Sequence, residues 1–214
     1  LSRDILAKAN INVPKAVNLA NQQAEDYPII ARPSTHSKGK NFVILKNIND
    51  FRNHYNSHNS QGWYYSAFVP KDRELRLHCA HGKVLAIMEK PKPSNASIIP
   101  WNRAVVGEEW DAVKWGDYKA IWCKTSLDAI KALGMDMGAV DLMLVGKIPY
   151  VCEVNTAPTL ISSPYVTKRY QMYFDWLFRA TARRNHWDYS KFEKGESFAW
   201  KNNQLLDSKD EQKK

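Results

Sequence analysis

The stretch Asp141-Leu-Met-Leu-Val-Gly-Lys-Ile-Pro-Tyr-Val-Cys-Glu153-Val-Asn155 decides the fold of this chain. Apolar or alternating residues flank its centre, Gly146-Lys147-Ile148-Pro149, and this pattern predicts a β-hairpin. If the hairpin pairs about its lysine, Asp141 lies opposite Glu153. Asn155 then follows Glu153 on the same face, because side chains alternate along a strand. The sequence therefore predicts three oxygen-bearing side chains on one face of a strand pair.

The two acids of this hairpin, Asp141 and Glu153, need a positive partner. Like charges directly across a strand pair lie about 5 Å apart and destabilise it. Two carboxylates and the Asn155 amide oxygen are hard ligands, which suit Mg²⁺ or Mn²⁺ better than zinc. The alternative is a solvated sheet face on which the acids are chance neighbours. The surrounding Val, Leu, Met and Cys residues disfavour it, because unpaired acids are seldom buried.

Length and composition set broad limits. The 214 residues, 44% hydrophobic and 25% charged, suffice for one large domain or two small lobes. No run approaches the roughly 20 apolar residues of a membrane span, and no signal peptide is visible, so we expect no membrane partner. Three widely spaced cysteines indicate reduced thiols and a cytoplasmic setting.

The formal net charge of +9 suits either nucleic acid or a polyanionic small molecule. The basic residues are spread along the chain, and we find no aromatic RNP pattern or zinc finger. The densest basic and aromatic region, 168–187, is a candidate docking face, although a solvated helix face explains it better. Nucleic acid is therefore a disfavoured partner.

Periodicity and turn residues predict alternating strands and helices. The expected strands are 27–33, 42–45, 63–69, 75–80 and 83–90, followed by the acidic hairpin. The expected helices are 2–9, 49–56 with Asn49 or Asp50 as cap, 118–133 with Ile121 inward, and one beginning at Pro164. Residues 91–116 are expected to form a long loop, and those from Ser190 onward a frayed tail. The fold class is α+β.

Three further features carry candidate chemistry. Arg32 ends a strand before a polar loop that contains Gly39, an arrangement that can cover phosphates but is also an ordinary turn. Glu74 and Arg76 share one strand face, as a ligand site or a surface ion pair. Asn102 emerges from the proline-rich loop, where a polar side chain is mildly more functional than structural.

Taken in order, these features resemble the ATP-grasp superfamily, within it the RimK-like carboxylate–amine ligases and their phage-type relatives. The most specific element is Gly138-Ala-Val-Asp141 with Glu153-Val-Asn155-Thr-Ala-Pro158, which resembles the family's G-V-D … E-V-N-x-x-P metal motif. The resemblance covers about residues 1–160. It implies an ATP-grasp fold in which two lobes with antiparallel sheets clamp a nucleotide. The implied division is an N-lobe at 1–69, a C-lobe with the metal site at 70–164, and a helix with a polar tail at 165–214.

The resemblance also implies roles for individual residues. The metal ligands would be Asp141, Glu153 and Asn155, holding two Mg²⁺ ions. The nucleotide would contact a phosphate-binding arginine and loop, a hinge beside adenine, and an acid on the ribose: Arg32, Ser37, Gly39, Ala67, Phe68, Val69 and Glu74. The catalytic groups near the transferred phosphoryl group would be Arg76, Lys90 and Asn102.

The implied activity is ATP-dependent ligation of a carboxylate to an amine through an acylphosphate, with amino acids, peptides or proteins as substrates. Arg32 replaces the family's usual lysine, and Ala67 replaces an acidic hinge residue. Family members normally carry an N-terminal domain before the point where this sequence starts. By the resemblance, that domain would lie on a partner chain, or have been lost, or this sequence would be a fragment of a longer protein. The alternative function is a catalytically idle nucleotide-binding module with a structural or assembly role. The setting would be the cytoplasm, or the host cytoplasm if the protein is phage-encoded.

Overall fold

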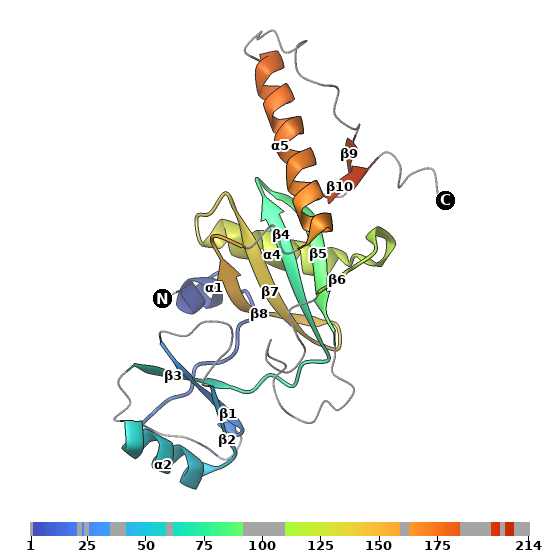
Figure 1. The fold of residues 1–214 in the computed structure, drawn as a ribbon. Coiled ribbons are helices and arrows are strands. Elements are labelled where there is room, and N and C mark those ends of the chain that lie inside the picture. Colours follow the sequence, from blue (N-terminus) through green and yellow to red (C-terminus); the bar gives the residue numbers. More distant parts are fainter. Residues whose placement is uncertain are drawn as a thin grey trace.

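The computed structural model describes residues 2–20, 23, 26–34, 42–58, 62–91, 110–158, 163–184, 198–201 and 204–207. They form two β-sheets, a small one at the bottom of Figure 1 and a larger one above it. The fold is α+β with antiparallel neighbours in both sheets, as predicted. Among the described strands, one pair is parallel, β10 with β5.

The small sheet has the strand order β2-β1-β3 and is covered by one helix. Its elements are β1 (Ile29–Pro33), β2 (Val43–Leu45), α2 (Ile48–His58) and β3 (Trp63–Ala67). The cap of α2 is Asn47, whose Oδ1 accepts hydrogen bonds from the amides of Asn49 and Asp50 at 2.9 and 3.0 Å. The predicted cap at Asn49 or Asp50 was therefore wrong by two or three residues, because Asn47 can satisfy both amides at once.

The larger sheet has the order β8-β7-β4-β5-β10-β9, and β6 pairs with β5. Its strands are β4 (Arg73–Ala80), β5 (Lys83–Lys90), β6 (Asp111–Ala112), β7 (Met137–Val145), β8 (Ile148–Asn155), β9 (Phe198–Lys201) and β10 (Gln204–Asp207). The predicted β4–β5 hairpin is confirmed. Its turn residues His81 and Gly82 have φ of 45° and 74°, which the right-handed twist of a two-residue hairpin requires. The chain from Ser190 onward was predicted to be frayed. That prediction was wrong for β9 and β10, which pair with each other.

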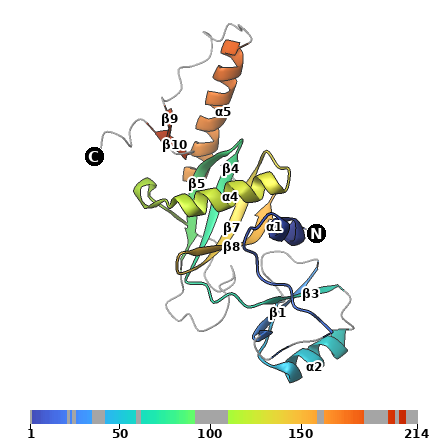
Figure 2. The same cartoon turned by 180° about the vertical axis from the view of Figure 1, so that it is seen from behind.

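Helices cover both faces of the larger sheet. On one face α4 (Ala120–Ala132) and α1 (Ser2–Lys8) pack over an apolar core, and Figure 2 shows α4 lying across the strands. A short 3-10 turn, η2 (Trp115–Asp117), precedes α4. Leu127 and Ile130 of α4, and Leu133 just after it, face the core as predicted. The prediction was wrong for Ile121, which is 47% exposed, whereas Trp122 is only 5% exposed. A bulky indole fills the core at the position next to the one that the apolar spacing favoured.

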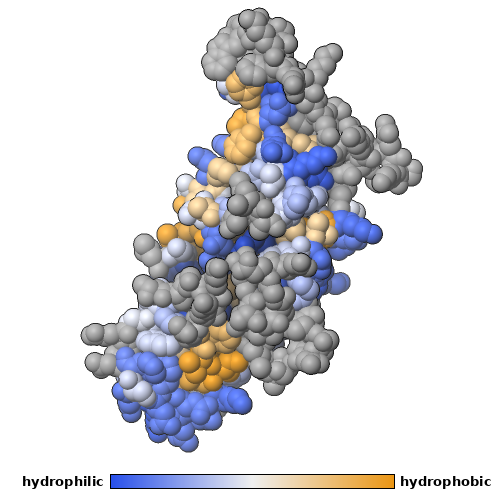
Figure 3. Space-filling model, in the orientation of Figure 1, coloured by the Kyte–Doolittle hydropathy of each residue, from blue (hydrophilic) through white to orange (hydrophobic). Residues whose placement is uncertain are grey.

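On the opposite face lies α5 (Pro164–Arg184), which begins at the predicted proline. Its first half packs through Val166, Tyr170 and Tyr173, and its second half projects beyond the strands (Figure 1). Hydrophobic residues are visible on the surface of α5 (Figure 3), and Phe174 and Phe178 are among its exposed side chains. The end of this face nearer the small sheet carries charged side chains.

The start of the chain also packs on the larger sheet. Leu6 and Ile11 belong to the core beneath α4, and the Val151 amide donates to the Asn12 carbonyl oxygen at 2.8 Å. The chain then pairs at Ala16 with Ser66 of the small sheet. The division into segments at 1–69, 70–164 and 165–214 stays a prediction.

Candidate active site

The acidic hairpin has the predicted facing pair. Asp141 of β7 lies opposite Glu153 of β8, and Asn155 lies opposite Ala139. The cause differs from the prediction. The turn has two residues, since Val145 pairs with Ile148, and this register alone would place Asp141 opposite Cys152. An irregularity at Cys152 inserts one residue into β8, which brings Glu153 to the face of Asp141.

Gly138, at the start of the motif, allows β7 and β8 to approach closely. A Cβ atom at this position would lie 2.9 Å from the Asn155 carbonyl oxygen and 2.8 Å from the Met135 side chain. The Met135 side chain could move aside, but the contact with the Asn155 carbonyl oxygen could be relieved only by movement of the backbone. The glycine therefore helps to place Asn155 beside the acidic pair.

The positive charge that the acids require comes from Arg76 of β4. Its Nε and Nη2 donate to the two oxygens of Asp141 at 2.6 and 2.7 Å. The strands place the residues directly opposite each other, and Asp141 is only 6% exposed. Burial raises the pKa of Asp141, while the bonds from Arg76 oppose that change. The short bidentate geometry is that of an ionised pair.

A second charged group adjoins this pair on the same face. Glu74 accepts a hydrogen bond from Lys90 at 3.1 Å and another from Lys71. Burial raises the pKa of Glu74, but the two ammonium groups outweigh burial and the pKa lies below its ordinary value. The sequence predicted Glu74 and Lys90 as site residues and missed Lys71, whose spacing of three residues from Glu74 was the available signal.

Trp110, just before β6, covers these cations and was not predicted. The Arg76 Cζ and the Lys90 Nζ lie 4.9 and 5.7 Å from the centroid of its ring. Both distances fall within the range of cation–π interactions.

Arg32 reaches the larger sheet from the small one. Its Nη1 lies 4.0 Å from the Cys152 Sγ at the irregular point of β8. Its Nε is buried and has no hydrogen-bond partner among the described residues. A guanidinium from β1 therefore lies beside the acidic hairpin, and its role in binding phosphate stays a prediction.

The predicted hinge, Ala67 to Val69, follows β3 and leads into the larger sheet. The amides of Ala67 and Phe68 donate to the carbonyl oxygens of Lys15 and Pro28 at 2.8 and 3.0 Å. An adenine here would meet carbonyl oxygens or the Val69 amide. The remaining predicted site residues, Ser37, Gly39 and Asn102, lie outside the described residues.

The predicted metal set consists of buried Asp141, exposed Glu153 and half-buried Asn155. Within the described ranges, no three His, Cys, Asp or Glu residues are close enough to share one ion. A site here would therefore use two carboxylates and one amide oxygen. This donor set fits Mg²⁺, since each Asp141 oxygen has a second lone pair beyond its bond to Arg76. The metal assignment stays a prediction.

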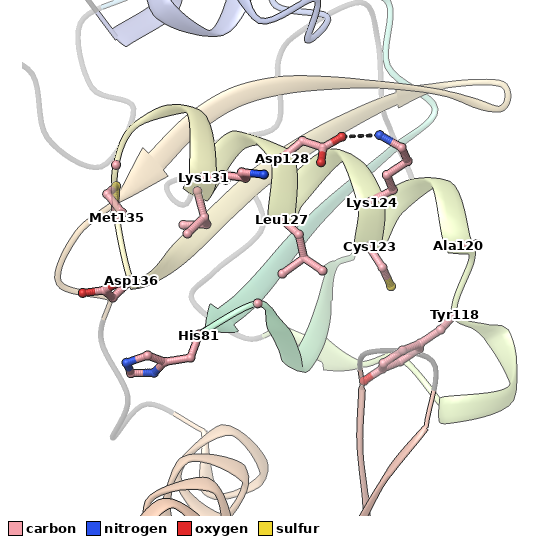
Figure 4. A pocket seen from close by; sticks show the side chains of 13 residues that line it. His81, Tyr118, Ala120, Cys123, Lys124, Leu127, Asp128, Lys131, Met135 and Asp136 are labelled. Carbon is pink, nitrogen blue, oxygen red and sulfur yellow. Dashed lines mark hydrogen bonds and ion pairs between the residues drawn. The ribbon is translucent and has the colours of Figure 1, made fainter.

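A cavity of about 1090 Å³ lies elsewhere, between α4 and the β4–β5 turn (Figure 4). Cys123, Leu127, Ile130 and Met135 give it apolar walls, and Lys124 and Asp128 form an ion pair at its rim. None of the predicted site residues lines it. This cavity is therefore distinct from the charged site.

Comparison with known proteins tests the fold. No protein-family model and no curated protein matches the chain. Solved structures do match. A D-alanine–D-alanine ligase from Bacillus anthracis complexed with ATP has a TM-score of 0.58 and 19% identity, over 79% of this chain and 58% of that one. The chain has the ATP-grasp fold.

Two further ATP-grasp matches are similar in extent. An L-amino acid ligase from Bacillus licheniformis has a TM-score of 0.51 and 20% identity, covering 72% of this chain and 39% of that chain. The ATP-grasp ligase PsnB, complexed with a minimal precursor, Mg and ADP, has a TM-score of 0.55 and 15% identity, covering 75% and 50%. This chain thus spans about half the length of the structures it matches. The narrower RimK-like and phage-type assignments stay predictions.

Charged groups from several strands gather on one face of the larger sheet. The acidic hairpin, Arg76 and Glu74 lie on one face of the larger sheet, and Arg32 meets them from the small one.

In the part of the chain that the structure describes, no helix is both long and apolar enough to cross a membrane.

Proposed function

We propose that the chain acts as an ATP-dependent ligase that joins a carboxylate to an amine through an acylphosphate. The observation that carries this proposal is the buried charged layer of Arg76, Lys90, Glu74 and Asp141, which Arg32 approaches from the second sheet. ATP and Mg²⁺ (or Mn²⁺) are the proposed co-substrate and metal. Structures with ATP, and with Mg and ADP, among those matched support both choices.

The proposed reaction has two steps. An oxygen of the substrate carboxylate attacks the γ-phosphorus of ATP, the bond to the bridging oxygen breaks, and ADP leaves. The amine nitrogen then attacks the acylphosphate carbonyl carbon, loses a proton to solvent and expels phosphate as the C–N bond forms. No protein nucleophile is required, so the chain contributes positioning and charge neutralisation.

The proposed role of each residue follows from its position in the two sheets. Arg32 and Lys90 neutralise phosphate oxygens from opposite sheets, and Arg76 keeps Asp141 ionised in its buried place. Glu74 holds the ammonium of Lys90, and its proposed contact with the ribose would use the lone pairs that remain. Bound at Asp141, Glu153 and Asn155, Mg²⁺ would offset the charge that grows on the phosphate oxygens. The proposed substrates are free amino acids, or carboxylate and amine groups of peptides and proteins.

Hydroxylamine provides a direct test, because it traps an acylphosphate as a hydroxamate whatever the natural amine is. The purified chain is incubated with Mg·ATP, hydroxylamine and a panel of amino acids and peptides, and hydroxamate and ADP are measured together. We expect both products with at least one acid. In Glu153→Gln the rate should fall about 100-fold, the size of effect seen when one preorganised charge contact is lost.

Three results separate the alternatives. Mg·ATP binding without ADP release for any acid would favour the idle nucleotide-binding module. No binding of Mg·ATP at all would remove the proposal. An unchanged rate in Glu153→Gln would exclude the metal assignment while leaving the ligase activity in place.

A further inference from the structure

We propose that Trp110 is a positioning residue of the ATP site, whose indole holds Arg76 and Lys90 in the arrangement that a triphosphate requires. The inference rests on the proposed function and adds a residue that the sequence motifs do not indicate.

Strand register brings Trp110 to the charged face. In the β5–β6 pair, Met88 lies opposite Ala112 and Glu89 lies opposite Asp111. The next step of this register sets Trp110 against Lys90. Because side chains alternate, Trp110 then shares the face of Lys90 and not that of Glu89. The indole also packs against the apolar cluster that α5 forms with the larger sheet.

One ring contacts two cations that are each fixed from another side. The distances to the ring centroid are 4.9 Å for Arg76 and 5.7 Å for Lys90. Asp141 takes the Nε and Nη2 donors of Arg76, and Glu74 takes one donor of Lys90. The indole thus completes a frame in which neither cation can swing away from the sheet.

This frame leaves one nitrogen of the Arg76 guanidinium for a ligand. Arg76 bonds Asp141 through Nε and Nη2, so its Nη1 has no acceptor among the described residues and is available to a phosphate oxygen. The ring also excludes water from one side of both charges, which strengthens their attraction for phosphate. Without the ring, the two cations would be better hydrated and more mobile.

The first test compares Trp110→Met, which keeps an apolar side chain, with Trp110→Phe, which keeps an aromatic face. Calorimetric titration with Mg²⁺ and a non-hydrolysable ATP analogue should show about tenfold weaker binding for Trp110→Met, the size of a partly buried cation–π contact, and most of the affinity restored in Trp110→Phe. A matched control is Trp122→Met, which removes the contact 5.0 Å from Arg73 on the opposite face of β4. The control should bind as the parent does.

The second test does not depend on nucleotide. Reductive methylation followed by mass spectrometry should modify Lys90 several-fold faster in Trp110→Met than in the parent or in Trp110→Phe. If Trp110→Met does not fold, a ring-fluorinated tryptophan inserted at position 110 keeps the shape and removes the negative ring face. It should lose affinity as Trp110→Met would.

The outcomes are separable. Equal affinity and equal Lys90 labelling in all variants at position 110 would overturn the role of Trp110 and leave the ligase proposal standing. A parent chain that binds no nucleotide but shows faster Lys90 labelling in Trp110→Met would overturn the ATP site and retain the positioning role. Loss of affinity in Trp122→Met as large as in Trp110→Met would also overturn the inference, because the effect would then be general.

Discussion

Alternate residues of β4 serve the two faces of the larger sheet in opposite ways. Leu75 and Leu77 are fully buried against α4, where shape and apolar area decide their contribution. Glu74 and Arg76 point to the other face and are held by Lys90 and Asp141. The apolar face stabilises the fold whether or not a ligand is bound. On the charged face, burial of the charges costs free energy, but it leaves charged groups in place for a ligand.

We expect the largest loss of stability when the buried ion pair of Arg76 and Asp141 is broken. Arg76→Met leaves the Asp141 carboxylate buried without its partner, and we expect the free energy of unfolding to fall by about 3–5 kcal/mol. Adding Asp141→Leu should recover most of that loss, because the unpaired charge is then gone. Urea denaturation at neutral pH measures both. A loss below about 1 kcal/mol in the single variant would show that the charged face is solvated and not buried.

The matched change on the apolar face is Leu144→Ala. Leu144 is buried beneath α4, so its truncation should cost about 3 kcal/mol through lost burial and a cavity. Unlike Arg76→Met, it should leave the affinity of folded protein for Mg·ATP unchanged, as measured by titration well below the melting temperature. Weaker binding in this variant would mean that the two faces do not act independently.

A third effect appears only in acid. Burial, together with the nearby charge of Arg76, lowers the pKa of His78 from 6.5 to about 4. Between these two values the unfolded chain binds a proton that the folded chain does not. Stability therefore falls as the pH drops from about 6.5 toward 4, by at most on the order of 3 kcal/mol, and is fully present above 6.5.

His78→Gln isolates this effect. The side chain lies under α5, 3.4 Å from the Tyr170 hydroxyl, and glutamine can still form a hydrogen bond there. Denaturation curves at pH 7 and pH 4.5 should show a smaller acid loss in the variant than in the parent. Parallel losses in both proteins would assign the acid sensitivity to the carboxylates instead.

Local pattern was enough to predict the hairpins, the helix at Pro164 and the facing of Asp141 and Glu153. It was not enough to predict how the hairpin achieves that facing, because a turn one residue shorter and an extra residue at Cys152 give the same pairing. The polar composition after Ser190 concealed the β9–β10 hairpin, whose pairing with β5 is a non-local contact.

The charged site shows the same limit. Arg76 and Glu74 could be assigned to one face from alternation alone. Trp110 could not, since it joins them only through the register of β6 with β5, across a segment that carries no periodic signal. Nor does sequence reveal that Arg32 reaches Cys152, because the two belong to different sheets. Periodicity predicts which face a residue occupies, and tertiary pairing decides which neighbours it meets there.

Within the charged face, we expect the smallest effect on stability at Glu153. Glu153 is exposed and Asp141, directly opposite, is buried. Because solvent already screens Glu153, Glu153→Gln should change the free energy of unfolding by less than about 0.5 kcal/mol, even though the proposed turnover falls about 100-fold. Thermal denaturation without nucleotide measures the first quantity, and Mg²⁺ should raise the melting temperature of the parent more than that of the variant. Destabilisation above about 2 kcal/mol would instead give Glu153 a structural role and weaken its assignment as a metal ligand.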